Sequence, residues 1–196
     1  CVQTMPDVSP GKWHLAHVTW FWETFLLKPA QAEYTPFDPR FNYLFNSYYE
    51  AVGERHARPE RGFLTRPGLT DVLAYRAYVD EAVTRWFDEA DAKAIEAFHT
   101  VIETGFAHEE QHQELFLTDI KHVLSRNSFP EAAYVREDKA APQLTAQRPD
   151  PEWVAFEGGL FEFGHEGEDF AFDNEGPRHK SWLEPFAIAS RPVTNA

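Results

Sequence analysis

The spacing of the apolar residues changes along this chain, and that change limits the folds available to it. In three stretches before residue 127, apolar side chains recur every three or four residues, the period of an amphipathic α-helix. From Trp153 onward, WVAFEGGLFEFG and SWLEPFAIASRPVTN are short segments with a period of two, separated by glycine and charged turns. The sequence therefore predicts an α+β fold, with a mainly helical part followed by a β-rich part.

The first helix is expected over residues 9–28. Ser9 is its predicted N-cap, Pro10 suits its first turn, and Lys28-Pro29 is expected to end it. The following residues 29–67 are rich in aromatic residues, Pro, Asn and Arg and have no sustained period. Because so long a loop is uncommon unless it has a function, this stretch is predicted to line a site and to contain short helical turns.

Two more helices are expected, over residues 70–90 and 92–126. The segment that follows, KAAPQLTAQRPDPEW, contains three prolines among polar residues, which is typical of an interdomain linker. The predicted organisation is a helical domain at residues 1–137, a linker at 138–151 and a β-rich domain at 152–196.

The charge and the cysteine content argue against several classes of protein. With 18 basic and 32 acidic residues, the net charge of −14 repels phosphate backbones and anionic membranes. There is no apolar run of about 18 residues. The only cysteine is Cys1, which excludes an intrachain disulfide and a zinc site of four cysteines. We therefore expect a soluble, cytoplasmic protein with no nucleic-acid or membrane partner.

The strongest chemical signal is the pair His108 and His112 in AHEEQHQEL. Residues four apart share one helix face, with Cβ atoms about 6 Å apart, so two imidazoles can bind one metal ion. His17, in KWHLAHVTW, is the third candidate ligand, because an imidazole on the inner side of an aromatic helix needs a partner once it is buried. His14 is a fallback ligand or a group that supports the ligands.

Spacing alone leaves other interpretations open. A histidine on an aromatic helix face is ordinarily a hydrogen-bonded core residue, and HEEQHQE could be a solvated face because Glu and Gln form helices well. HEEQH also fits the H-E-x-x-H pattern of zinc peptidases, and Glu131 lies at a spacing where some of them place a third ligand. Against a peptidase, Glu131 follows Phe129-Pro130 at a helix break, and no strand-forming segment precedes the motif.

A series of longer motifs gives the chain a family resemblance. In order, they are SPGKWHLAHVTWFWETF, FNSYYEAVGERH, HEEQHQE, GGLFEFG, FAFDNEGPRH and PFAIASRPVTN. The series resembles the sulfoxide synthases of ergothioneine biosynthesis over nearly the whole chain. The resemblance implies a DinB-like helical bundle followed by the beginning of a C-type-lectin-like domain of the formylglycine-generating, sulfatase-modifying-factor (FGE-sulfatase) type.

The resemblance also implies a cofactor and a reaction. Non-haem Fe(II) would be held by His17, His108 and His112, leaving positions open for a thiolate, a substrate imidazole and O2. The enzyme would use O2 to join cysteine or γ-glutamylcysteine to Nα-trimethylhistidine (hercynine), giving a sulfoxide. Close alternatives are an ovothiol-type 5-histidylcysteine sulfoxide synthase, which uses unmethylated histidine, and a selenium-transferring relative. A different class is a non-catalytic metal-binding bundle whose β-rich part is an interaction module.

Residues near the histidines are candidate substrate and supporting groups. By the resemblance, Gln111 is a candidate contact for the substrate imidazole, and Glu109 and Glu114 could orient ligand imidazoles. A guanidinium matches a carboxylate with two hydrogen bonds, so three loop arginines are either carboxylate ligands or solvated residues. They are Arg58, Arg61 and Arg66. Three aromatic residues are expected to line the cavity or to belong to the core: Phe45, Tyr48 and Tyr49.

The resemblance further implies that the chain is a piece of a longer protein. A further helix is expected before Cys1. Most of the second domain, with its substrate-binding and proton-donating residues, is expected after Ala196. Because the site would lack a wall without them, this piece is not expected to be active alone.

Overall fold

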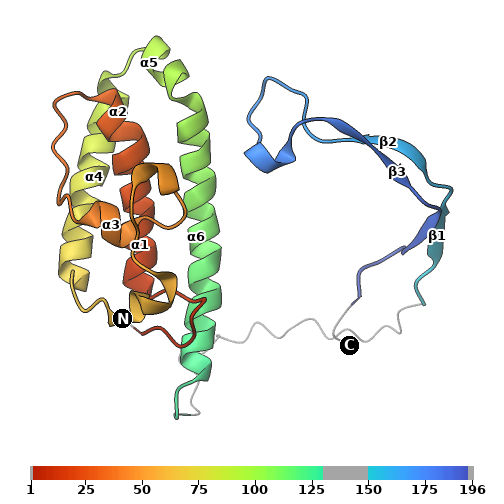
Figure 1. Ribbon diagram of the computed structural model, residues 1–196, viewed down its shortest axis with the longest axis horizontal. Helices are drawn as coiled ribbons and strands as arrows, with labels where there is room; N and C mark the ends of the chain where they lie inside the picture. The colour runs from red at the N-terminus through yellow and green to blue at the C-terminus, as the bar shows by residue number, and fades with distance from the viewer. Residues whose placement is uncertain (1, 130–149, 194–196) are drawn as a thin grey trace, which may run out of the picture. The chain divides into compact units, whose positions relative to one another are not determined.

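The computed structural model describes residues 2–129 and 150–193. The chain divides into two compact units, Cys1–Ala133, which is helical, and Tyr134–Ala196, which contains the strands (Figure 1). This confirms the predicted order of an α-helical part and a β-rich part. The predicted linker at 138–151 lies, except for its last two residues, outside the described part of the chain, so its bounds stay a prediction.

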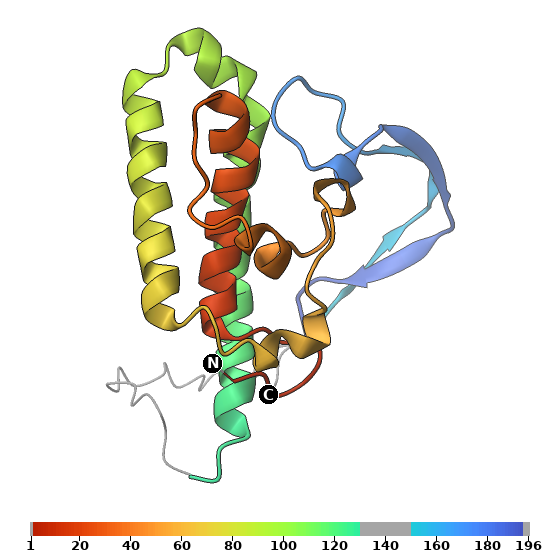
Figure 2. The ribbon, with the colours of Figure 1, turned by 60° about the vertical axis from the view of Figure 1, so that its left-hand side comes forward.

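Helix α1 (Gly11–Phe21) is the central helix of the first unit. It contacts both α4 (Leu69–Glu89) and α6 (His99–Ser125) and runs between them in Figures 1 and 2. Nine of its eleven residues are buried. A helix that is enclosed on several sides needs apolar residues on several sides, which explains its aromatic sequence. Its two histidines, His14 and His17, are buried with the rest.

The first helix begins and ends differently from the prediction. Ser9 does not cap it, because the helix starts one residue later; the Ser9 N–H donates to the carboxylate of Asp119 at 2.8 Å. Lys28-Pro29 does not end it either. The helical backbone continues through the π-helical segment η1 (Trp22–Leu27) into α2 (Lys28–Ala30), so it ends one residue after Pro29.

The π-helical segment connects α1 to both of its neighbours. Trp22 packs against Gly105 of α6 and donates its indole N–H to Glu109 at 3.1 Å. Glu23 is turned toward α4, where its buried carboxylate accepts the hydroxyl of Tyr75 at 2.8 Å. A π-helical turn has an extra residue compared with an α-helical one, so it changes which side chains face which neighbour.

The predicted loop at 29–67 does contain short helical turns. They are α3 (Phe41–Phe45) and two 3₁₀ turns, η2 (Glu50–Val52) and η3 (Arg58–Phe63). Phe41 and Phe45, at the ends of α3, are both buried in the core. The loop is therefore anchored against α1.

The second predicted helix matches α4, but the third is two helices. α5 (Ala92–Ala97) is separated from α6 by Phe98, whose φ of −110° and ψ of 9° interrupt the helix. Asp91 caps α5 by accepting the N–H of Ala94 at 2.8 Å. Because the apolar spacing continues across Phe98, the sequence predicted a single helix.

The core of the first unit surrounds α1. Its side chains come from α1, η1, α3, α4 and α6. The most deeply buried are Trp13, Ala16, Trp20, Leu26, Leu27, Phe45, Val72, Tyr75 and Val79. Within the described ranges, no helix combines the length and apolar character needed to cross a membrane.

The second unit contains two antiparallel strand pairs. β1 (Trp153–Phe156) pairs with β4 (Phe186–Ala189), and β2 (Gly159–Phe163) pairs with β3 (His179–Leu183). Gly158, between β1 and β2, has a φ of +75°, and a Cβ there would lie 2.4 Å from a backbone oxygen of β3. Glycine is required at this position for both reasons. The strands lie where the period-two segments predicted them.

Candidate metal centre

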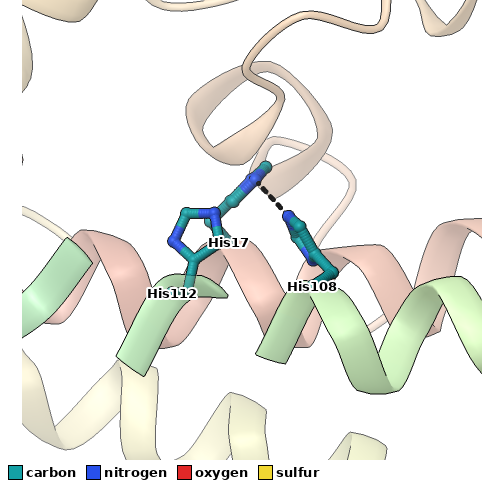
Figure 3. A group of neighbouring side chains, drawn as sticks. All are labelled: His17, His108 and His112. Carbon is teal, nitrogen blue, oxygen red and sulfur yellow. Dashed lines mark hydrogen bonds between the residues drawn. The ribbon is translucent and has the colours of Figure 1, made fainter. Parts of the chain in front are cut away.

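Three histidines from two helices converge in the first unit. His17 comes from α1, His108 and His112 come from successive turns of α6, and Figure 3 shows their rings turned toward one another. One nitrogen of each ring lies within 4.8 Å of the others, and Nε2 of His17 is 3.1 Å from Nε2 of His108. Two nitrogens that bind one ion at right angles, each at about 2.1 Å, are about 3.0 Å apart, so the separation of His17 and His108 fits a shared ion.

Packing and one hydrogen bond fix the ring of His17. Its residue is 2% exposed, and the ring stacks on Trp13 and Trp20 with centroid separations of 4.6 and 5.6 Å. Nδ1 lies 2.6 Å from the carbonyl oxygen of Phe45 and therefore donates to it. A neutral imidazole that donates through Nδ1 keeps its lone pair on Nε2, the nitrogen that faces α6.

The other two rings also keep nitrogen atoms available. Nδ1 of His112 contacts Nδ1 of His14 at 2.9 Å, which leaves Nε2 of His112 for a metal ion. Nε2 of His108 faces His17, while its Nδ1 is buried and has no hydrogen-bond partner among the described residues. The protein therefore does not saturate the hydrogen-bonding capacity of the cluster, and the donor set fits a metal ion that prefers imidazole.

Burial keeps the three imidazoles neutral. It lowers the pKa of His108 to about 4. Burial, with a smaller effect from the nearby His108, lowers the pKa of His112 to about 3. Burial and then the two other rings lower the pKa of His17 well below its usual range. Since a metal ion binds the neutral imidazole, all three rings are ready to bind at neutral pH.

His14 contacts the cluster, as the supporting role predicted for it requires. Besides its contact with His112, its Nε2 lies 2.9 Å from the carboxylate of Asp119. Burial lowers the pKa of His14 and outweighs the opposite effect of Asp119. The sequence interpretation missed Asp119. It lies seven residues after His112, two turns along the same helix face, and that spacing could have indicated it.

The two carboxylates predicted to orient the ligands differ in position, and Glu109 borders the same cavity as His112. Glu109 accepts hydrogen bonds from the indole of Trp22 at 3.1 Å and from Arg76 at 2.7 Å. Successive helix residues are about 100° apart, so Glu109 faces these neighbours while His108 faces the cluster. Glu114 is exposed. One carboxylate oxygen of Glu109 is therefore bound by Trp22 and Arg76, and a role in orienting the ligands stays a prediction for both glutamates.

Gln111, the candidate contact for a substrate imidazole, is exposed on α6. The largely apolar cavity beside His112 is bordered instead by Leu15, Gln113 and Phe116, together with His14. The role of Gln111 therefore stays a prediction.

Arg61 is the most enclosed of the three candidate arginines. It is 2% exposed, and its guanidinium carbon lies 3.4 Å from the centre of the Trp13 ring. The guanidinium donates to the hydroxyls of Ser9 and Ser47 at 3.0 and 3.1 Å, while Nε has no partner among the described residues. Burial lowers its pKa to about 9, and the nearby Arg58 acts in the same direction.

The other two arginines lie in different places. Arg58 is partly buried and donates to the hydroxyl of Tyr48 and to a backbone oxygen of Asp7. Arg66 is exposed and borders a separate cavity with Asp38. The structure therefore groups Arg58 with Arg61 and separates Arg66 from them.

The three aromatic residues predicted to line the cavity or to belong to the core also lie in different places. Phe45 is a core residue whose carbonyl orients His17. Tyr49 packs against the core, with its ring 5.7 Å from that of Trp20. Tyr48 is 66% exposed and contacts Arg58. Phe45 and Tyr49 therefore belong to the core and its edge, and only Tyr48 lies on the surface beside an arginine.

Comparison with known proteins concerns the second unit. Residues 138–196 match the family model of the sulfatase-modifying factor enzyme 1-like domain. This match covers less than a third of the chain and does not include the histidine cluster. No curated protein matches the chain. The predicted type of the β-rich domain is confirmed, and the DinB-like nature of the helical unit stays a prediction.

Proposed function

We propose that this chain carries the iron site of an O2-dependent sulfoxide synthase of the ergothioneine type. The observation that supports this most directly is the convergence of three neutral imidazoles, His17, His108 and His112, around one point. The match of the following domain to the sulfatase-modifying factor type, and the resemblance of the motifs, favour this function over other three-histidine sites. A DinB-like bundle, an oxidoreductase activity and a cytoplasmic location are parts of the same proposal.

Fe(II) held by three imidazoles would keep coordination positions open and supply the oxidative chemistry. The proposed reaction joins the sulfur of cysteine or γ-glutamylcysteine to the imidazole carbon of hercynine. One atom of O2 becomes the sulfoxide oxygen. The other leaves as water with the hydrogen of the thiol and the hydrogen of the imidazole carbon, so O2 is the only oxidant.

The chain's own residues orient and shield the ligands. The Phe45 carbonyl holds one nitrogen of His17, and Trp13 and Trp20 pack on that ring and exclude water from it. The guanidinium of Arg61 is bound to two hydroxyls and to no carboxylate of the described residues. Arg61 and its neighbour Arg58 are therefore the proposed ligands for a substrate carboxylate.

A zinc peptidase of the H-E-x-x-H class is less well supported. That class needs the glutamate after the first histidine to activate water, but Glu109 is held by Trp22 and Arg76. Glu131, the alternative third ligand, lies outside the described residues, whereas His17 already completes the cluster. The ovothiol-type and selenium-transferring alternatives would use the same histidines and differ only in substrate.

Anaerobic Fe(II) binding tests the site. The parent protein should bind one Fe(II) per chain, and His17→Ala should weaken binding by about 100-fold or more because one of three ligands is lost. His122→Ala is the matched control, since His122 lies on α6 but bonds Thr4 instead of the cluster. If His17→Ala binds as tightly as the parent protein, the ligand assignment is wrong.

Turnover by the longest available form of the protein tests the reaction. Sulfoxide formation from hercynine and a thiol, with matching O2 consumption, is the expected result. A preference for histidine over hercynine would identify the ovothiol-type alternative. If the protein binds iron but consumes no O2 with any thiol and histidine derivative tried, the non-catalytic metal-binding bundle is the better interpretation.

A further inference from the structure

A chain of hydrogen bonds leads from one proposed metal ligand to a carboxylate on the same helix. Nδ1 of His112 is 2.9 Å from Nδ1 of His14, and Nε2 of His14 is 2.9 Å from Oδ2 of Asp119. We propose that His14 and Asp119 are positioning residues, which fix the tautomer of His112 and thereby select its Nε2 as the metal-binding atom. This inference rests on the proposed role of His112 as a ligand.

The direction of these bonds is determined at the carboxylate. A carboxylate only accepts, so Nε2 of His14 must carry the proton that it shares with Asp119. The neutral ring then has its lone pair on Nδ1, which can only accept. Nδ1 of His112 must therefore be the N–H donor in the contact between the two rings. This leaves the lone pair of His112 on Nε2.

Burial makes this arrangement hard for water to replace. The side chains of His14 and Asp119 are 7% and 13% exposed. Oδ2 of Asp119 also accepts the N–H of Ser9 at 2.8 Å, which holds the carboxylate in place. The His14 ring lies edge-to-face with Trp13 and Phe116, so its plane is fixed as well. Metal-binding histidines are commonly held in orientation by neighbouring residues that do not bind the metal themselves.

The three proposed ligands differ in what orients them. A backbone carbonyl orients His17, and Nδ1 of His108 has no partner among the described residues. Among the three, only His112 has an Nδ1 that is held by a side chain. Substitution of those side chains can therefore test the inference without removing a ligand.

Nitrogen-15 NMR of the metal-free full chain can read the tautomer directly. In the parent protein, His112 is expected with its proton on Nδ1. His14→Phe keeps a flat ring but removes the acceptor, so His112 should shift toward the Nε2–H form. Asp119→Ala should cause the same shift through His14. Asp119→Asn should keep the parent tautomer, because its amide oxygen can accept both bonds that Oδ2 now accepts.

Anaerobic Co(II) titration of the same proteins gives a second measurement. His14→Phe and Asp119→Ala should each weaken binding about 10-fold to 100-fold, and Asp119→Asn should stay within about threefold of the parent protein. His122→Phe is the matched control, since it removes an imidazole of α6 that bonds Thr4. Circular dichroism checks the fold of each variant, and the two Asp119 variants decide the outcome if His14→Phe does not fold.

Two results would overturn the inference. One is a His112 that stays in the Nδ1–H form in both His14→Phe and Asp119→Ala. The other is a Co(II) affinity in these variants equal to that of His122→Phe. If His112→Ala itself binds Co(II) as tightly as the parent protein, the proposed metal site fails and the positioning role fails with it.

Discussion

The two units of this chain differ in where their apolar side chains lie. In the helical unit, Trp20 and Val72 are fully buried, and the core continues from α1 into α4 and α6. In residues 150–193, no described residue is buried, and Trp153 and Trp182 are 70% and 64% exposed. Packing therefore stabilises the first unit, whereas the described strands of the second are held mainly by backbone pairing.

This difference accounts for the position of the histidine cluster among the described residues. Ligands must be kept neutral and in fixed orientations, and both conditions come from burial around α1. The described strand pairs of residues 150–193 bury no side chain that could provide such an environment. The histidine cluster lies in the unit that has its own core.

Truncating a tryptophan in each unit should give the largest contrast. Trp20→Ala removes a fully buried indole and its hydrogen bond to Asn42, so it should lower the free energy of unfolding by about 3–5 kcal/mol. Trp182→Ala, the control, should change it by less than about 0.5 kcal/mol. Urea unfolding followed by circular dichroism measures both. Equal losses of unfolding free energy would show that the core of the second unit contributes as much to stability as that of the first.

A smaller contrast is expected from two glycines. A Cβ on Gly105 would lie 2.4 Å from the ring of Trp22, so Gly105→Ala should cost about 1–3 kcal/mol of stability through overpacking. Gly176→Ala meets no atom within 4 Å and should have little effect. Thermal unfolding compares them. Because alanine is about 1 kcal/mol better than glycine inside a helix, a rise in Tm for Gly105→Ala would show that Trp22 can move aside.

The fold could be predicted from the sequence where it depends on local spacing. The helices, the strands and their order follow from apolar periods of 3.6 and 2, which neighbouring residues determine. The break at Phe98 and the π-helical segment could not be predicted in this way. They accompany contacts between distant residues, such as Trp22 with Gly105, that leave no local pattern.

The candidate site, too, could be predicted where it depends on local spacing and not where it depends on contacts between distant residues. The spacing of His108 and His112 indicated a ligand pair, but only the resemblance connected His17 to them. The carbonyl of Phe45 could not be predicted, because every residue has a backbone carbonyl. The partners of Glu109, Trp22 and Arg76, could not be predicted either, because they come from other elements.

The smallest expected effect is that of mild acid on metal binding. Three ordinary histidines, each with a pKa near 6.5, would lose about 1000-fold in affinity between pH 7.5 and pH 5.5, since protons compete with the ion at every ring. Here the pKa values of His108 and His112 are about 4 and 3, and that of His17 is also well below 6.5. Anaerobic Co(II) titration should therefore show a change of less than about twofold over this range.

The same pKa shifts predict that the stability of the metal-free chain, unlike its metal affinity, depends strongly on pH. The folded state favours neutral rings, so their contribution to stability is fully present above about pH 6.5 and is lost as the pH falls toward the folded-state values near 4 and 3. Tm should fall across that window, and less steeply in His108→Gln, which has one depressed histidine fewer. A Co(II) affinity that drops about tenfold per pH unit above pH 5.5, in a chain that is still folded, would contradict both expectations, because it would show that protons reach the rings as easily as at an exposed site.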